Sequence, residues 1–382
     1  MTEGLAAIIL AAGLSSRMGA CKPLLPLGAG TVLDQVIELF QGCAIPEIIV
    51  VTGYHARDVA PVAARAGVRV IHNPDFAQGM FSSIRAGVQA LSTQCQGFFL
   101  LPVDIPLIRR GSLILLARAF RELSARLLYP VYYGQRGHPP LISTALRHTI
   151  VQGDGRYGLR GILAEVEKQA PGQVRDITVA DANILFDMDT QEDYRKGRVR
   201  FAGRDIPTMA ECELLLRDIF SLPDKGLAHG EQVAAVAVAI CDLLAMTRTP
   251  APDRELCRVC GWLHDLAKGH PNHEEEGGRR LSELGFDRAA AIVAAHRETG
   301  YVADTLVTEK EIVFLADKIV RGGERVGIEE RFLQKLDQYG HDPMACAAIR
   351  RRLFQARAVW TAIERECGGS LAALLDPDGT GA

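Results

Sequence analysis

The chain has 382 residues, of which 48% are hydrophobic and 23% are charged, and its net charge is -3. This composition excludes a mainly disordered chain, and the near balance of 43 basic and 46 acidic residues gives no overall basic field that would attract nucleic acid or anionic lipid. We find no run approaching the roughly 20 apolar residues of a membrane span. The nine cysteines are scattered, which is typical of a reducing compartment, so we expect a cytoplasmic protein of two domains.

The first half of the chain alternates between short apolar runs and helical periodicity. Strands are predicted at residues 6–10, 47–52, 68–71 and 97–101, and helices at 31–41, 57–66, 82–91 and 112–124. Residues 126–133 and 139–143 look like an antiparallel excursion, followed by a helix at 157–168 and a strand at 174–179. This order predicts an α/β fold with a doubly wound, mostly parallel sheet.

The second half loses the strand pattern almost completely. Runs at 233–244, 257–266 and 289–296 have helical periodicity, which predicts an all-α domain. The basic segment 195–200 lacks apolar periodicity, and Pro207 and Pro223 follow it, so we place the boundary there. We expect an α/β domain at 1–200, a linker at 201–224 and an all-α domain at 225–382.

A loop rich in glycine and basic residues follows the first predicted strand. In open α/β sheets, ligands bind at the carboxyl ends of the strands, which is where this loop lies. Gly13 and Gly19 would let the backbone approach a phosphate closely, and Arg17 and Lys22 would neutralise its charge. The spacing fits neither the Walker A pattern nor GxGxxG. The loop therefore predicts a triphosphate site of another kind.

The loop pattern AAGxSxRMGxxKxLLP resembles the signature of the MobA-like nucleotidyltransferases of molybdenum cofactor synthesis. Further matches run in order to about residue 195 and cover about half of the chain: Asn73-Pro74, Ser82-Ser83, Asp104-Ile105-Pro106, Gly137-His138-Pro139 and Asp187-Met188-Asp189. The resemblance implies that the nucleotide is bound by Ala11, Ala12, Gly13, Ser15, Arg17, Gly19, Lys22, Asn73, Ser82, Ser83 and Asp104.

The same resemblance implies a magnesium site and a reaction. Asp104 follows a predicted strand and would share Mg²⁺ with Asp189, for which Asp187 is the alternative. A nucleoside monophosphate would pass from an NTP to molybdopterin, with release of pyrophosphate. Because the attacking phosphate is already anionic, no general base is needed, and Arg17, Lys22 and magnesium would supply positioning and charge neutralisation.

The choice of nucleotide depends on one small residue. Cytidylyltransferases of this family typically show Ala-Ala-Gly where guanylyltransferases show Ala-Gly-Gly, so Ala12 favours CTP. Pro102-Val103 before Asp104 departs from relatives that often have glycine directly before this aspartate. The product could pass to a molybdoenzyme. The alternative to cytidylyl transfer onto molybdopterin is guanylyl transfer, or nucleotidyl transfer to a sugar- or alcohol-phosphate acceptor.

The second half gathers histidines and aspartates in a pattern that indicates a metal site. His264 and Asp265 are adjacent in a predicted helix, and Lys268 lies on the same face, where it could meet a phosphate. With His229 and Asp317 they resemble the HD phosphohydrolase superfamily over roughly residues 225–335, which implies a Mn²⁺, Fe²⁺ or Zn²⁺ site that activates water.

Two further histidines extend this prediction. His273 and His296 would complete a second metal position, as in two-metal members of that superfamily. We therefore expect a bifunctional enzyme in which His264, Asp265 and Lys268 carry the hydrolytic chemistry. The alternative is an HD module that senses a metal or nucleotide and regulates the first domain.

Overall fold

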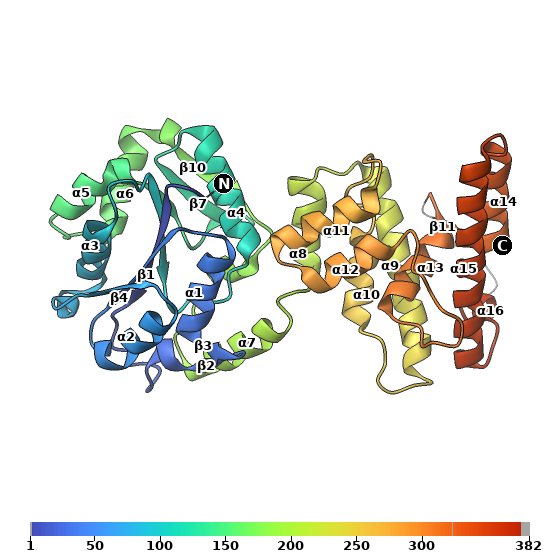
Figure 1. Ribbon diagram of the computed structural model, residues 1–382, viewed down its shortest axis with the longest axis horizontal. Helices are drawn as coiled ribbons and strands as arrows, with labels where there is room; N and C mark the ends of the chain where they lie inside the picture. The colour runs from blue at the N-terminus through green and yellow to red at the C-terminus, as the bar shows by residue number, and fades with distance from the viewer. Residues whose placement is uncertain (1, 323, 376–382) are drawn as a thin grey trace. The chain divides into compact units, whose positions relative to one another are not determined.

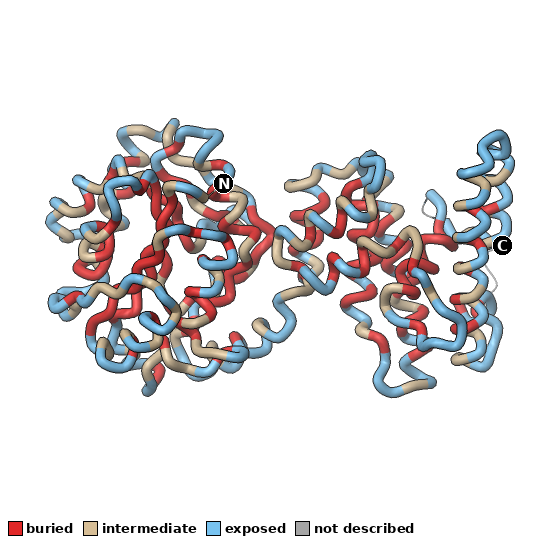
Figure 2. The backbone as a smooth tube through the Cα atoms, viewed as in Figure 1, coloured by how far each residue is buried: buried red, intermediate tan, exposed pale blue. Residues whose placement is uncertain are grey.

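The computed structural model describes residues 2–322 and 324–375 and divides into two compact units (Figure 1). The first unit is Met1–Arg204 and the second is Asp205–Ala382. Figure 2 shows that buried segments run through the interior of each unit. Each unit is described separately below.

The first unit is built on a mixed sheet with helices on both faces. Its strands are β1 (Leu5–Ala11), β2 (Pro26–Leu27), β3 (Gly30–Thr31), β4 (Glu47–Thr52), β5 (Arg69–His72), β6 (Gly97–Pro102), β7 (Leu127–Tyr132), β8 (Gln135–Arg136), β9 (Leu141–Ser143) and β10 (Val174–Thr178). Its helices are α1 (Val32–Gly42), α2 (Ala56–Arg65), α3 (Met80–Ala90), α4 (Arg110–Leu123), α5 (Arg147–Gln152), α6 (Gly158–Gln169) and α7 (Gln191–Ala202).

The order of the main sheet is β10-β7-β9-β6-β1-β4-β5, with β8 paired to β7. The pairs β6-β1, β1-β4, β4-β5 and β10-β7 are parallel, whereas β9 runs antiparallel to β6 and to β7. The predicted mostly parallel α/β sheet and its antiparallel excursion are therefore confirmed.

The central strand β1 explains how one short run supports two hydrophobic cores. All seven of its residues are buried, and alternate side chains point to opposite faces. Ala7 and Ile9 pack on the side covered by α1, α2 and α4, whereas Ile8 and Leu10 pack on the side of α3, α5 and α6. This double burial produces the continuous apolar run in the sequence.

The basic segment 195–200, which we interpreted as part of a boundary, lies instead inside helix α7 of the first unit. Thr190 and Asp193 form a capping box that starts this helix. Tyr194 and Phe201 pack against the core, so only two aromatic anchors hold an otherwise polar helix. This sparse apolar pattern hid the helix from the periodicity argument.

The second unit is helical, as predicted. Its elements are α8 (Met209–Leu214), α9 (Asp224–Ala245), α10 (Arg254–Leu263), α11 (His273–Leu284), α12 (Asp287–Ala295), α13 (Glu309–Lys318), α14 (Ile328–Gln338), α15 (Pro343–Cys367) and α16 (Leu371–Leu375), with the short strands β11 (Val320–Arg321) and β12 (Glu324–Arg325). The expected linker 201–224 contains α8, a π-helical turn at Leu215–Ile219 and the buried residues Cys212 and Leu214.

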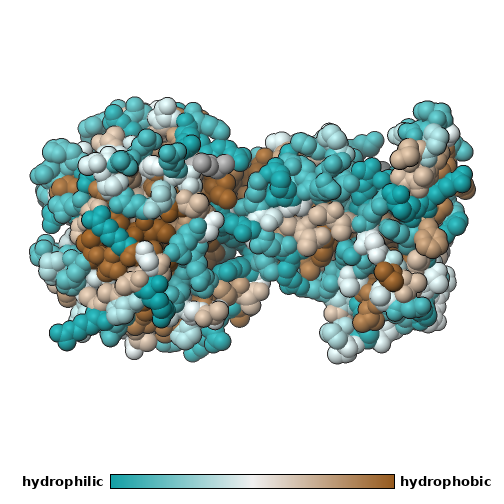
Figure 3. Space-filling view, in the orientation of Figure 1, coloured by the Kyte–Doolittle hydropathy of each residue, from teal (hydrophilic) through white to brown (hydrophobic). Residues whose placement is uncertain are grey.

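Helix α9 is longer than its predicted core at 233–244. It starts at Asp224, so His229 lies within the helix. The prediction missed its first turns because they are polar and carry no apolar signal. By length and composition alone this helix could cross a membrane, contrary to our expectation for the sequence, but 56% of its most apolar window is buried inside the protein. On the face shown in Figure 3, hydrophilic residues cover most of the second unit.

Candidate functional site

The glycine-containing loop lies at the carboxyl edge of the sheet, directly after β1. Strand β6 runs parallel beside β1, with Leu10 opposite Pro102, so Asp104 leaves the sheet next to this loop. The Ser15 hydroxyl accepts a hydrogen bond from the Lys22 backbone N–H at 3.2 Å, which closes the loop on itself. Gly19 has a φ of +69°, a left-handed conformation that favours glycine.

Lys22 joins two carboxylates that are far apart in the sequence. Its Nζ lies 2.6 Å from Asp189 Oδ1 and 3.3 Å from Asp104 Oδ2. Arg17 Nη1 lies 3.0 Å from the other oxygen of Asp189. The Lys22 side chain is only 12% exposed, whereas that of Arg17 is 77% exposed. Four of the predicted site residues thus meet in one polar cluster.

Asp189 reaches this cluster because the chain before α7 is tied to the sheet edge. The Met188 N–H donates to the Asp104 carbonyl at 2.8 Å, and Thr190, not Asp189, caps the helix. The hydrogen bond from Lys22 lowers the pKa of Asp189, whereas burial and the Asp104 charge raise the pKa of Asp187. The edge of the sheet therefore gathers carboxylate oxygens, the ligands that Mg²⁺ prefers.

Of the other residues predicted to bind the nucleotide, some are buried and some are exposed. Asn73 donates to the hydroxyls of Ser82 and Ser83 at 2.8 and 2.9 Å, and all three side chains are buried. The Ser82 hydroxyl also contacts the carbonyls of Asp75 and Gly79, so these side chains are already hydrogen-bonded within the protein. Ala11 and Ala12 are buried as well, whereas Gly13 is exposed and has open space where a side chain would lie.

The second unit brings its predicted histidines and aspartates into one cluster, in which His264, Asp265, His296 and Asp317 are buried and His229 and His273 are partly buried. Ligand atoms of His229, His264 and Asp265 lie within 4.8 Å of one another, and so do those of Asp265, His273 and His296. Asp265 belongs to both groups, so it could serve as a ligand in either. Asp317 Oδ1 lies 3.4 Å from His229 Nε2 and 3.6 Å from His264 Nε2, which adds a carboxylate to the first group.

Two of these histidines are oriented by the ends of helices. His264 follows α10, which ends at Leu263, so His264 and Asp265 lie in a turn and not inside the predicted helix 257–266. Its Nδ1 donates to the Gly261 carbonyl at 2.8 Å, and His296 Nδ1 donates to the Val293 carbonyl at 2.7 Å. Each Nε2 therefore faces the cluster, where it could bind a metal.

An orphaned atom supports the metal interpretation. His264 Nε2 is buried and has no hydrogen-bond partner in the part of the chain that the structure describes. A buried polar atom without a partner is costly, and a divalent metal would satisfy it. The mixture of imidazole and carboxylate ligands suits Mn²⁺, Fe²⁺ or Zn²⁺.

Glycines allow the helices to approach closely enough to form this cluster. A Cβ added to Gly230 of α9 would lie 2.7 Å from the Trp262 carbonyl oxygen of α10, and one added to Gly261 would lie 2.7 Å from Ala234 Cα. Because both positions exclude a side chain, α9 and α10 hold His229 and His264 side by side, with ring centroids 5.2 Å apart.

Basic residues neutralise the two aspartates. Burial opposes ionisation of Asp265, but His264 and Lys268 outweigh it and hold the pKa of Asp265 at about 2. Lys268 Nζ lies 2.5 Å from Asp265, which places it beside the metal cluster as predicted. Asp317 is paired with Lys318 at 2.6 Å and with Arg331 at 3.3 Å. Sequence reasoning missed Lys318 and Arg331, because no spacing rule connects them to the histidines.

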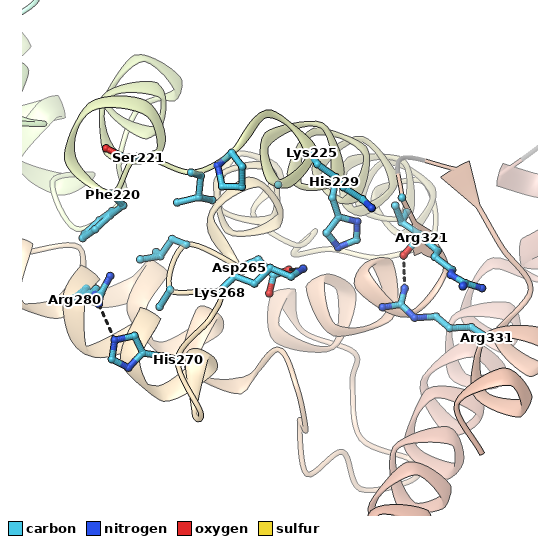
Figure 4. A pocket seen from close by; sticks show the side chains of 17 residues that line it. Phe220, Ser221, Lys225, His229, Asp265, Lys268, His270, Arg280, Arg321 and Arg331 are labelled. Carbon is cyan, nitrogen blue, oxygen red and sulfur yellow. Dashed lines mark hydrogen bonds and ion pairs between the residues drawn. The ribbon is translucent and has the colours of Figure 1, made fainter. Parts of the chain in front are cut away.

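The cluster opens into two cavities of about 560 and 490 Å³. The larger cavity, shown in Figure 4, runs from Phe220 and Arg280 past Asp265 and Lys268 to Arg331. His270 is exposed and lines this cavity as well. The cluster is thus accessible from two sides.

Comparisons with known proteins match a family model to each half of the chain. Residues 7–170 match the family described as the MobA-like NTP transferase domain, and residues 226–322 match the HD domain. Both resemblances inferred from the motifs are therefore confirmed.

Several relatives align with about the first half of the chain. The chain is 32% identical to the molybdenum cofactor cytidylyltransferase of Escherichia coli K12, over 51% of this chain and 95% of that protein. It is 33% identical to the nicotine blue oxidoreductase of Paenarthrobacter nicotinovorans, over 48% and 92%. It is 31% identical to the molybdenum cofactor guanylyltransferase of Mesorhizobium japonicum, over 41% and 77%.

Proposed function

The chain belongs to the MobA-like NTP transferase family and carries an HD domain in its second half, and from this premise we propose that it is a cytidylyltransferase of molybdopterin joined to a metal-dependent phosphohydrolase. The first activity would use CTP and release pyrophosphate. The second would hydrolyse a phosphoester. The product of the first unit would then be available to a molybdoenzyme.

The observation that carries the first activity is the meeting of Lys22 with Asp104 and Asp189 beside the glycine-containing loop. In the reaction, an oxygen of the acceptor phosphate forms a bond to the α-phosphorus of CTP, and the bond to pyrophosphate breaks. The nucleophile is already anionic, so the task of the residues is to position two polyanions and offset their charge. Lys22 and Arg17 supply this positive charge.

Asp104 and Asp189 would hold the magnesium ion of this site. Their carboxylates fit Mg²⁺, which binds hard oxygen ligands and neutralises triphosphate oxygens when present. Lys22 keeps the two carboxylates together at the sheet edge, and the low pKa of Asp189 keeps it ionised at neutral pH. Both effects prepare the site to receive a cation.

The preference for CTP is supported by Ala12 and by the similarity to a cytidylyltransferase. Ala12 is buried under the loop, and the backbone N–H of Tyr54 donates to its carbonyl at 3.3 Å. Compared with a glycine at this position, the methyl group of Ala12 leaves less space beside β1. A guanylyltransferase relative makes GTP the alternative to test.

The phosphohydrolase activity is supported by the buried histidine and aspartate cluster. His229, His264, Asp265 and Asp317 would hold one divalent metal, and Asp265, His273 and His296 a second. When bound there, a divalent metal would supply activation of water for attack on the phosphoester. Lys268 and Arg331 would offset the charge of the phosphate, because both line each of the two cavities at the cluster.

One experiment tests the transferase assignment. The protein is incubated with molybdopterin, Mg²⁺ and each of the four NTPs, and pyrophosphate release is followed, with Asp104→Asn as the inactive control. We expect the fastest release with CTP. Faster release with GTP would establish the guanylyl alternative, and no release with any NTP would contradict molybdopterin as the acceptor.

A second experiment tests the hydrolase assignment. Hydrolysis of p-nitrophenyl phosphate is measured with Mn²⁺, Fe²⁺, Zn²⁺ and Mg²⁺, with Asp265→Asn as the control. We expect hydrolysis that depends on a transition metal and on Asp265. A metal-loaded protein without hydrolysis would favour a regulatory role for the HD domain.

A further inference from the structure

Large apolar side chains are left exposed after three neighbouring strands of the first unit. Leu14 follows β1, Tyr54 follows β4, and Met80 begins the helix that comes after β5; these residues are 56%, 57% and 62% exposed. Because β1, β4 and β5 are parallel neighbours, their carboxyl ends lie at the same edge of the sheet. Covering apolar surface is favourable, so this part of the edge suits an organic group better than a further phosphate.

This apolar part of the edge lies on the side of β1 away from the metal-binding aspartate. The strand order is β6-β1-β4-β5, so Asp104, which follows β6, and Tyr54, which follows β4, flank the carboxyl end of β1 from opposite sides. Lys22 Nζ lies 3.3 Å from Asp104, which places this positive charge of the loop on the β6 side. Two strand spacings of about 5 Å each separate these sides, and a nucleoside triphosphate is long enough to span them.

The Tyr54 ring is held by two aromatic neighbours. Its centroid lies 4.7 Å from that of His55 and 6.0 Å from that of Phe76, at interplanar angles of 88° and 69°. Both contacts are T-shaped, and within residues 2–322 and 324–375 no aromatic ring stacks flat on Tyr54. A planar base can take that position, because stacking on an aromatic side chain is open to every base.

Buried polar side chains fix the turn that carries Phe76. Asn73 Oδ1 accepts a hydrogen bond from the Asp75 backbone N–H at 3.0 Å, and the Ser82 hydroxyl contacts the Asp75 carbonyl at 2.9 Å. Phe76 follows directly and is partly buried. Asn73 and Ser82 therefore contribute to this edge by holding Phe76 against Tyr54.

Gly53 connects this aromatic pair, Tyr54 and Phe76, to the residue that favours CTP. A Cβ added to Gly53 would lie 2.7 Å from the Ala12 carbonyl oxygen and 2.7 Å from Phe76 Cβ, so a glycine here lets these two residues approach each other. The Tyr54 N–H donates to the same Ala12 carbonyl at 3.3 Å. The position of the Tyr54 ring is therefore tied to the loop that would bind the triphosphate.

We infer that Tyr54, supported by Phe76, stacks on the base of the nucleoside triphosphate that the first unit uses. This inference rests on the proposed transferase function and adds a residue that binds the nucleoside. Every base offers a planar face, so Tyr54 contributes affinity for CTP and for GTP alike, whereas Ala12 bears on the choice between them. The phosphates lie toward Lys22 and Asp104, so Tyr54 takes no part in bond formation at the α-phosphorus.

Binding measured on the full chain without an acceptor tests this role. The background is Asp265→Asn, which removes a predicted metal ligand of the second unit, so that the nucleotide is not hydrolysed during the titration. CTP, GTP and inorganic tripolyphosphate are titrated by calorimetry in excess Mg²⁺. The binding that disappears when Lys22→Ala is added to this background is assigned to the first unit.

The variants are Tyr54→Ala, Tyr54→Phe and Phe76→Ala, with Leu123→Ala as the matched control. Leu123 is also an exposed apolar residue, at 44%, and it ends α4. The chain passes from α4 into β7, which runs in the same direction as β6, so Leu123 lies at the opposite edge of the sheet from the loop. Thermal unfolding of each variant verifies that it is folded.

We expect Tyr54→Ala to weaken the binding of CTP and of GTP by about tenfold each and to leave that of tripolyphosphate, which has no base, unchanged. Tyr54→Phe keeps the ring, so its affinity for CTP should stay within about twofold. Phe76→Ala should weaken CTP by about threefold, because it acts through Tyr54. Leu123→Ala should bind all three ligands as the background does.

Two results would overturn the inference: unchanged affinity for CTP in Tyr54→Ala, or an equal loss for CTP and tripolyphosphate, which would mean that this variant disturbs the phosphate loop. Binding of CTP that does not depend on Lys22 would contradict both the inference and the proposed nucleotide site. Binding that follows the expected pattern, together with no pyrophosphate release in the presence of molybdopterin, would contradict the proposed acceptor and support the role of Tyr54.

Discussion

The two candidate sites hold charged groups in opposite ways. In the first unit, Asp104 and Asp189 lie on loops at the edge of a sheet, and a lysine from a third loop holds them together. In the second unit, His264 and His296 are fully buried at helix ends, and each is oriented by a backbone carbonyl. The first site depends on electrostatics near solvent, whereas the second depends on helix packing.

This difference predicts how each site tolerates change. A loop residue at the sheet edge contributes little to the core, so its loss should affect chemistry and spare the fold. A residue that sets the distance between α9 and α10 should affect the fold and the metal together. The predictions below test this contrast.

The largest effects should come from removing one acidic ligand from each site. Asp265→Ala should lower phosphohydrolase activity and bound transition metal by at least about 100-fold, because it removes a carboxylate shared by both metal groups. Asp104→Ala should do the reverse and abolish nucleotidyl transfer alone. Both assays and metal analysis on the two variants check this. Loss of transfer in folded Asp265→Ala would show that the sites are coupled.

Lys22 and Arg17 should differ in the first unit. Lys22→Ala should reduce transfer by about 100-fold, because a nearly buried cation between two carboxylates is lost. Arg17→Ala should cost less, about tenfold, because its side chain is 77% exposed and solvent screens its charge. Steady-state rates and thermal unfolding of both variants provide the test. Near-wild-type transfer in both would argue against a triphosphate site in this loop.

Alanine substitutions of two glycines in α9 should show whether close packing against α10, and not the loss of a glycine as such, changes stability. Gly230→Ala should lower the free energy of unfolding by about 1–3 kcal/mol and reduce metal binding, because its Cβ would meet the Trp262 carbonyl at 2.7 Å. Gly226→Ala, also in α9, meets no atom closer than 3.8 Å and should be neutral or stabilising. Chemical denaturation of both variants decides the matter. Equal stability would mean that α9 and α10 can move apart at no cost.

The smallest effect should be on the choice of nucleotide. Ala12→Gly removes one methyl group beneath the loop, so we expect the preference for CTP over GTP to fall by about tenfold. The ratio of kcat/KM for the two nucleotides measures it. An unchanged ratio would place the selecting residue elsewhere in the unit.

Periodicity predicted the sheet because β1 is buried on both faces. The motif assigned Lys22 and Asp104 to one nucleotide site, and the structure brings them together because β1 and β6 are parallel neighbours. Periodicity did not predict α7, because Tyr194 and Phe201 are the two aromatic residues that anchor this otherwise polar helix to the core. The sequence also did not reveal the basic residues that line the smaller cavity. Lys335 and Arg352 reach the cavity only through the packing of α14 on α15, and no local pattern reports such a contact.

The carbonyl contacts of His264 and His296 have a consequence for the energetics of metal uptake. Each ring is already held in one rotamer and one tautomer by a hydrogen bond three residues back in the chain. Ordering a free side chain costs conformational entropy on binding, and here folding has met that cost in advance. The affinity of the cluster for its metals should therefore reflect ligand chemistry more than rearrangement, and the second unit should keep its helices when the metal is removed.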